Sequence, residues 1–145
     1  MSTDGRHGRV LALDPGSKRI GVAVSDVGQT MAFPRPALTV SPGLDVPAAV
    51  RSLCHEEGAA LVVVGLPKSL SGRDGAAADL ARSLAKQITE TTRGDGIDVE
   101  LHDERFTTVE ASRALAAAGH DARSQRALID SAAATVLLEA WLQCR

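Results

Sequence analysis

The sequence predicts a mixed α/β fold, in which one sheet of antiparallel and parallel strands carries helices on both faces. Two β-rich runs, residues 10–14 and 20–25, flank the turn at residues 15–19. Pro15 and Gly16 favour a tight reversal there, so the runs should form an antiparallel hairpin. Further along the chain, strand and helix patterns alternate, which is typical of parallel strands joined by helices. The expected order is two or three antiparallel strands, then helix, strand, helix, strand and two helices.

Length and composition predict one domain over residues 1–145, with residues 1–8 flexible. No apolar run approaches the roughly 18–20 residues of a membrane span or resembles a signal peptide, which favours a cytoplasmic protein without a membrane partner. Cys54 and Cys144 lack a metal-binding spacing and are expected to be free thiols. The net charge of −2 argues against binding nucleic acid through bulk positive charge, so any phosphate contact should be local.

The first half of the chain predicts an edge strand, a helix and a buried strand. Residues 33–40 contain two prolines, which suit an edge strand. Residues 44–57 place apolar side chains at helical spacing, with Pro47 tolerated in the first turn. Residues 59–64 form a continuous apolar run, as expected for a parallel strand covered on both faces.

The second half predicts a loop, three helices and a strand. Residues 69–75 are expected to form a loop, and from residue 76 a helix should bury Leu80, Leu84 and Ile88. Residues 97–101 are predicted to form a strand. The T-x-x-E spacing of residues 107–110 predicts a helix that ends near residue 119. The last helix is expected over residues 124–143, with one apolar stripe built from Leu128, Ile129, Ala132, Ala133, Val136, Leu137, Ala140 and Trp141.

Three acids lie at the boundaries of predicted strands and helices. Asp14 ends the first strand, Glu104 follows the last strand, and Asp130 borders the apolar stripe of the last helix. Strand ends on one side of an α/β sheet converge, so these residues can meet. Three adjacent carboxylates repel one another unless divalent cations keep them ionised. Such a cluster predicts two Mg²⁺ or Mn²⁺ ions and phosphodiester hydrolysis.

Basic and hydroxyl side chains near these acids are candidates for binding substrate. Lys18, Arg19 and Arg105 can neutralise phosphates, and Thr107, Thr108 and the backbone amides of a helix start can hold another. Residues 65–72 lack the spacing of a P-loop, so they are expected to form a strand-to-helix loop that borders the substrate cleft. His102 is expected to be structural.

Four motifs together resemble the YqgF/RuvX family: DPGSKRIGVAVSD at 14–26, GLPKSLSG at 65–72, DERFTTVEA at 103–111 and IDSAAATVLLEAWL at 129–142. The resemblance implies an RNase H-like fold and a nuclease that matures the 5′ end of the small-subunit (16S) rRNA precursor. By matching position, it makes Asp14, Glu104 and Asp130 the catalytic, metal-binding acids. The family often has a lysine-rich run before the last acid, where this chain has RSQR at 123–126. Arg126 retains charge there and is the expected substrate contact.

Other functions fit the same sequence. A Holliday junction resolvase would act on branched DNA, and it is expected to be a homodimer because it cuts two symmetric strands, whereas RNA trimming is possible for a monomer. A non-catalytic nucleic-acid-binding assembly factor is the alternative from another class. An actin- or Hsp70-like ATP-binding unit needs two such domains, and 145 residues supply one. No residue distinguishes RNA from DNA as substrate.

Overall fold

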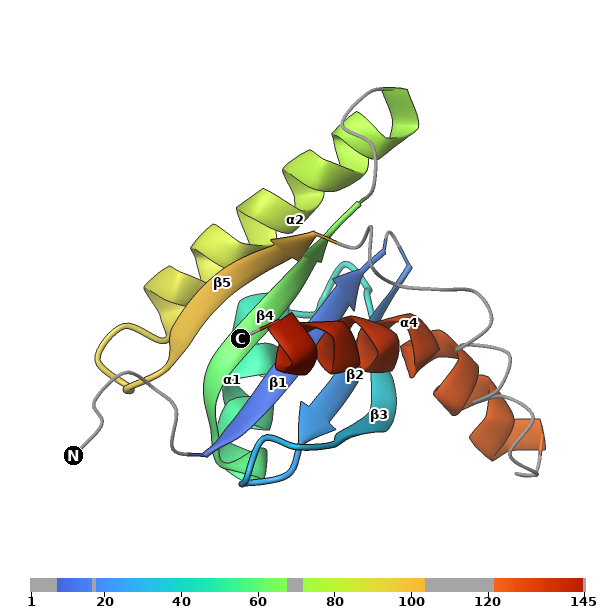
Figure 1. Cartoon of the computed structure of the whole chain (residues 1–145). Coiled ribbons are helices and arrows are strands. Elements are labelled where there is room, and N and C mark those ends of the chain that lie inside the picture. The colour runs from blue at the N-terminus through green and yellow to red at the C-terminus, as the bar shows by residue number, and fades with distance from the viewer. Residues whose placement is uncertain (1–7, 17, 68–71, 104–121, 145) are drawn as a thin grey trace.

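A computed structural model describes residues 8–16, 18–67, 72–103 and 122–144, without the side chains of residues 72–74 and 122–130. Its five-stranded sheet has the order β3-β2-β1-β4-β5 (Figure 1). β1 pairs antiparallel with β2 and parallel with β4, β2 pairs antiparallel with β3, and β4 pairs parallel with β5. The elements are β1 Arg9–Pro15, β2 Arg19–Ser25, β3 Ala32–Thr39, α1 Val46–Glu57, β4 Ala59–Leu66, α2 Gly72–Thr91, β5 Asp98–Asp103 and α4 Ala122–Cys144. The predicted mixed sheet is confirmed.

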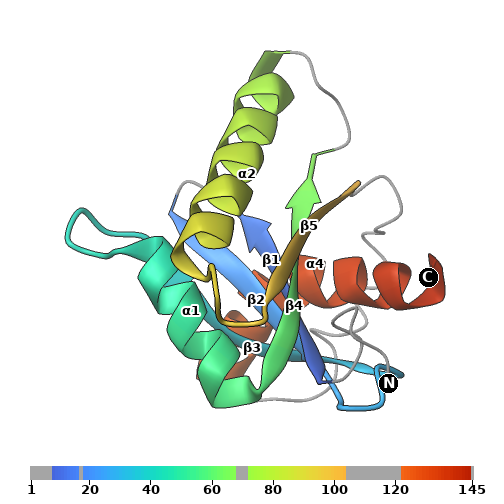
Figure 2. The ribbon, with the colours of Figure 1, turned by 90° about the vertical axis from the view of Figure 1, so that its left-hand side faces the viewer.

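Helices cover both faces of the sheet, as predicted. α1 and α2 lie on one face and α4 lies on the other (Figures 1 and 2). The side chains of β1 alternate between two cores, because successive residues of a strand point to opposite faces. Leu11 and Leu13 pack with α1 and α2, whereas Val10 and Ala12 pack with α4. We call these sides the α1/α2 face and the α4 face.

The β1–β2 hairpin forms with the predicted strands, but Gly16 is required for a different reason from the one expected. Its φ lies outside the left-handed region. A Cβ at Gly16 would lie 2.7 Å from the carbonyl oxygen of Arg19, closer than side-chain carbons approach backbone oxygens. The absence of a side chain, and not a positive φ, is what lets the chain reverse here.

Two helix predictions need correction. α2 begins at Gly72, so residues 72–75, predicted to lie in a loop, start the helix. A glycine costs only about 1 kcal/mol in a helix interior and does not stop one by itself. Leu80 is 43% exposed although Leu84 and Ile88 are buried, because α2 covers the sheet through Ala78, Ala81 and Ala85 as well.

The last helix buries more of its circumference than one stripe. Ala134 and Leu138 are fully buried, while Ala133 and Ala140 from the predicted stripe are only half-buried. The small side chains of α4 allow it to lie close to the sheet, so residues beside the stripe are enclosed too. The helix predicted over residues 107–119 lies outside the described residues, as do residues 1–7. In the part of the chain that is described, no helix is long and apolar enough to cross a membrane.

Candidate active site

Asp14 lies near the C-terminal end of β1 and is half-buried. It has the same strand parity as Val10 and Ala12, so it belongs to the α4 face. Its partner across the hairpin is the buried Gly21, which is on the same face and has no side chain. Asp14 therefore lies at the rim of the α4-side core, beside a strand position that has no side chain.

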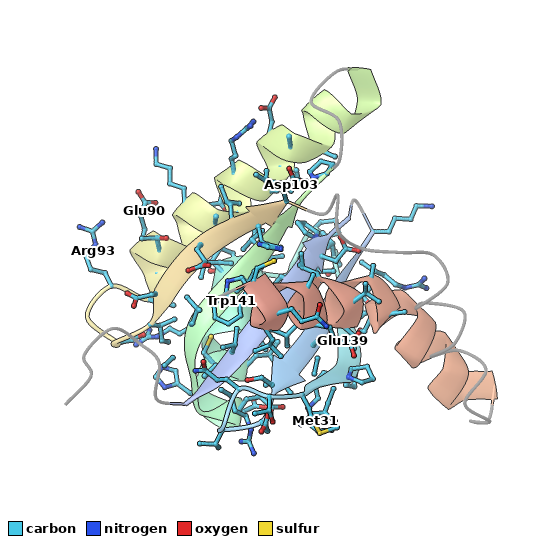
Figure 3. The ribbon with its side chains drawn as sticks, in the orientation of Figure 1. Met31, Glu90, Arg93, Asp103, Glu139 and Trp141 are labelled. Atoms are coloured by element: carbon cyan, nitrogen blue, oxygen red, sulfur yellow. The ribbon has the colours of Figure 1, made fainter. Side chains whose placement is uncertain are left out.

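The strand ends converge as predicted. β1, β4 and β5 are parallel, and their arrowheads gather at one edge of the sheet (Figure 1). Leu13 pairs with Val64, and the next residue along β4, Gly65, pairs with His102 of β5. Asp103, the last residue of β5, lies at this edge in Figure 3. Glu104 follows directly in sequence, so β5 delivers the chain to the edge where Asp14 lies.

A buried serine of α4 joins the helix to the second strand of the hairpin, β2, and to its neighbour β3. The Ser131 hydroxyl is fully buried; its Oγ accepts a hydrogen bond from the backbone N–H of Val22 at 3.1 Å and donates to the carbonyl oxygen of Arg35. These partners belong to β2 and β3. The helix therefore bonds to the backbone of two strands at the residue that follows Asp130.

A second polar contact joins α4 to β5. The indole N–H of Trp141 donates to the carboxylate of Glu100, and Trp141 is only 8% exposed. In Figure 3, Trp141 extends from α4 toward the sheet near β5. α4 thus spans the sheet from β3 and β2 at Ser131 to β5 at Trp141, and it crosses the strands that bear or precede the predicted acids.

The side chains of the other two predicted acids lie outside the part of the chain that is described. Glu104 lies outside the described residues, and Asp130 lies on α4 without a described side chain. Among the side chains that are described, no group of three His, Cys, Asp or Glu residues is arranged to hold a metal. Of the three predicted acids, only Asp14 has a described side chain, so the metal site stays a prediction.

The predicted substrate residues are similarly divided. Lys18 and Arg19 are exposed at the hairpin turn, and the carbonyl oxygen of Lys18 accepts from the N–H of Val40 at 2.8 Å, which joins the turn to the end of β3. These two cations therefore lie at the same end of the hairpin as Asp14. The other four fall outside the described side chains: Arg105, Thr107, Thr108 and Arg126.

Two titratable groups away from the edge that bears Asp14 have strongly shifted pKa values, and the structure explains both shifts. Burial, followed by the negative charge of Asp95, raises the pKa of the Cys54 thiol to about 11, so it is protonated and unreactive at neutral pH. The backbone N–H of Met31, then the backbone N–H and hydroxyl of Thr30, lower the pKa of Asp26 to about 2. Asp26 holds the β2–β3 turn, at the other end of β2 from Asp14, and is not a site residue.

A hollow of about 380 Å³ opens beside the hairpin turn on the α1/α2 side. Its lining is apolar apart from Ser83 and Gln87, and it includes the exposed Leu80: Pro15, Gly16, Ile20, Val40, Val46, Leu80, Ser83, Leu84 and Gln87. This lining contains no carboxylate and no basic side chain, so the edge with Asp14 is the better site for charged chemistry.

Sequence reasoning missed Ser131. The available signal was a single hydroxyl among small apolar residues, directly after an acid, in the run IDSAAATV at 129–136. A serine in a helix interior bonds its own backbone readily, so the sequence did not show that this one reaches two strands. Its role became visible only with the helix docked on the sheet.

Sequence comparison assigns the chain to a family over nearly its whole length. The family model RuvX, described as Holliday junction resolvase, matches residues 8–144. A protein of Mycolicibacterium paratuberculosis named "Putative pre-16S rRNA nuclease" is 44% identical, over 98% of this chain and 84% of that protein. Proteins of the same name from Streptomyces avermitilis and Acidiphilium cryptum are 41% and 38% identical, over 95% and 97% of this chain and 87% of each relative.

Solved structures share the fold at low sequence identity. Thermus thermophilus RuvC in complex with a Holliday junction substrate superimposes with a TM-score of 0.58 at 20% identity, over 96% of each chain. The fowlpox virus Holliday junction resolvase gives a TM-score of 0.60 at 10% identity, over 94% of this chain and 99% of that one. The family match from residue 8 to residue 144 shows that the chain belongs to the RuvX family of nucleases, and it has the fold of RuvC.

Proposed function

We propose that this protein is a metal-dependent endonuclease that matures the 5′ end of the 16S rRNA precursor in the cytoplasm. One observation carries the proposal. Asp14 is half-buried on the α4 face, at the edge where β1, β4 and β5 end and where β5 leads into Glu104. A carboxylate at a shared strand edge is well placed to join acids that come from other elements.

The proposed metal ligands are Asp14, Glu104 and Asp130. Carboxylate oxygens are the donors that Mg²⁺ and Mn²⁺ prefer, so the residue types fit the ions. Two bound ions supply activation of water and stabilisation of the leaving oxygen in phosphodiester hydrolysis. The protein itself orients the acids through the hairpin, β5 and α4, and Gly21 and Gly65 leave the rim beside Asp14 free of bulky side chains.

Basic residues around the edge are proposed to hold the nucleic acid. Lys18 and Arg19 are exposed at the end of the hairpin that bears Asp14, where they can contact phosphates beside the cleaved bond. Arg105, Thr107, Thr108 and Arg126 complete the proposed set. With a net charge of −2, binding should depend on these local contacts. We propose a monomer, because trimming one end of an RNA requires one site.

The names of the relatives support RNA as the substrate, since proteins 38–44% identical over nearly the whole chain carry the pre-16S rRNA nuclease name. Holliday junction resolution is the second candidate, acting as a homodimer. The family description and the fold shared with RuvC bound to a Holliday junction favour it. Both candidates use the same acids and differ in the polymer that is cut.

A side-by-side cleavage assay tests the proposal. The purified chain is incubated with Mg²⁺ or Mn²⁺ and either labelled 16S rRNA precursor or a four-way DNA junction. We expect cleavage near the mature 5′ end of the RNA. Asp14→Asn, Glu104→Gln and Asp130→Asn should each lower the rate by more than about 100-fold, since even indirect perturbation of a metal site costs about 10–100-fold.

Asp79→Asn is the matched control. Asp79 lies on α2, its side chain is 83% exposed, and its removal should leave cleavage unchanged. Full activity in Asp14→Asn would refute the assigned site. Cleavage of the junction alone would favour the second candidate, and tight RNA binding without cleavage of either substrate would favour a non-catalytic assembly factor.

A further inference from the structure

The pairing of β2 with β3 contains a β-bulge next to the candidate site. The pairing runs Ile20 with Leu38 and then Val22 with Arg35, so β2 advances by two residues while β3 advances by three. Such a bulge interrupts the regular ladder and leaves backbone groups that need other partners. Pro36 has no N–H to offer within the bulged segment.

Ser131 of α4 supplies hydrogen-bond partners for the backbone at this bulge. Its hydroxyl accepts from the N–H of Val22 and donates to the carbonyl of Arg35, which are the two residues paired directly after the register shift. Both capacities of the hydroxyl are used, so a fully buried serine is tolerated. Gly21, on the same face, has no side chain to obstruct the helix.

The strand carbonyl that receives this bond is itself held in place. The guanidinium of Arg35 forms a two-pronged ion pair with Glu57 at the end of α1, with Nε–Oε2 and Nη2–Oε1 distances of 2.9 and 3.3 Å. Two-pronged pairs restrict orientation more than single contacts do. β3 is therefore fixed from the α1/α2 face while its carbonyl is used from the α4 face.

The hydrogen bond between Ser131 and Val22 connects the segments that carry two of the proposed acids, Asp14 and Asp130. Asp14 pairs with Gly21 across the hairpin, about 5 Å away as for strand partners generally. Gly21 precedes Val22, whose N–H binds Ser131 at 3.1 Å, and Ser131 follows Asp130. One strand pair, one hydrogen bond and two peptide links join Asp14 to Asp130.

We propose that Ser131 is a positioning residue of the active site: its hydroxyl fixes α4 to the bulged backbone of β2 and β3 and so sets Asp130 relative to Asp14. This inference rests on the proposed function, because it assumes that both acids bind the same ions. The Ser131 hydroxyl is bonded to strand backbone on both its donor and its acceptor side, so we do not assign it as a ligand. It acts by holding the helix that bears one ligand against the hairpin that bears another.

The test compares Ser131→Ala with Thr135→Val. Thr135 is also buried on α4, but its hydroxyl donates only within the helix, to the carbonyl of Ser131 at 2.9 Å. Hydrogen exchange followed by NMR on the metal-free protein reports the bond directly. Ser131→Ala should speed exchange of the Val22 amide about tenfold, and Thr135→Val should leave it unchanged.

Mn²⁺ binding, measured by electron paramagnetic resonance, reports the effect on the site. Ser131→Ala should weaken Mn²⁺ binding about 10–100-fold, as loss of a supporting contact does, with less than about twofold change in Thr135→Val. Ser131→Cys keeps the size but bonds weakly, and it should fall between wild type and alanine. If Ser131→Ala does not fold, Ser131→Cys still tests the proposal.

Asp14→Asn separates the two proposals. If Asp14→Asn leaves Mn²⁺ binding unchanged, the proposed metal site fails. If Asp14→Asn abolishes binding while Ser131→Ala exposes the Val22 amide without weakening Mn²⁺ binding, the positioning role is overturned and the metal site stands. Equal losses of Mn²⁺ affinity in Ser131→Ala and Thr135→Val would also overturn it, because any buried hydroxyl would then have the same effect.

Discussion

The two faces of the sheet are built on different principles. On the α1/α2 face, the buried contacts between strands and helices are made by aliphatic side chains and the thiol of Cys54, and the Arg35–Glu57 ion pair lies at its partly exposed border. On the α4 face, the core is smaller and polar groups cross it: Ser131 bonds to strand backbone, and Trp141 bonds to Glu100. Leu13 and Asp14 are neighbours on β1 and point to opposite faces, one into an apolar core and the other to the candidate site.

The difference indicates a division of labour. An apolar interface tolerates small shifts, because dispersion and burial have no preferred direction. Hydrogen bonds to backbone fix both distance and orientation. The proposed site combines three acids from separate elements and would depend on the second kind of contact, so we expect the α1/α2 face to control stability and the α4 face to control metal binding.

The largest expected effect lies on the α1/α2 face. Ile88→Ala removes a fully buried side chain of α2 and should lower the free energy of unfolding by about 2–5 kcal/mol, through lost burial and the cavity left behind. Urea denaturation measures the loss, and Mn²⁺ binding per folded molecule should be unchanged. A large fall in Mn²⁺ affinity of the folded protein would break the comparison, since the apolar face would then also position the acids.

Trp141→Phe tests the α4 face away from Ser131. It keeps an aromatic side chain but removes the N–H that binds Glu100, and we expect a loss of about 1–2 kcal/mol in stability. Mn²⁺ binding should weaken, though less than in Ser131→Ala, because the bond orients β5 four residues before Glu104. Glu100→Gln retains an acceptor and should behave more like wild type. Unaltered Mn²⁺ binding in Trp141→Phe would restrict the positioning role of this face to Ser131.

The smallest effect is expected for Asp26→Asn, measured as stability against pH. The pKa of Asp26 falls from 3.8 to about 2 on folding, so its carboxylate stabilises the native state fully above pH 3.8. The advantage of wild type over Asp26→Asn should therefore shrink as pH falls from 3.8 through 2. Mn²⁺ binding at neutral pH should be equal in both proteins, because Asp26 lies at the far end of β2. If the difference in stability between wild type and Asp26→Asn stayed constant across this pH range, the hydrogen bonds that Asp26 accepts from Met31 and Thr30 would not be the cause of that difference.

Local pattern in the sequence determined most of the fold. Alternation in residues 20–25 and the prolines of residues 33–40 specified a hairpin strand and an edge strand, and the apolar run at 59–64 specified a parallel strand. These signals are local, because they depend on strand periodicity and on the missing N–H of proline. The four motifs also identified the family.

The tertiary structure decided what local pattern cannot express. Whether Leu80 is buried depends on how α2 lies on the sheet, and Gly16 is required because of a carbonyl three residues away that approaches only when the turn closes. The position of Asp14 on the α4 face was implicit in strand parity. The bond from Ser131 to Val22 spans 109 residues and depends on a bulge that follows from strand pairing. Hydrogen bonds of this range arise only when separate elements dock, and so only the docked structure places α4 on the face of the sheet that bears Asp14.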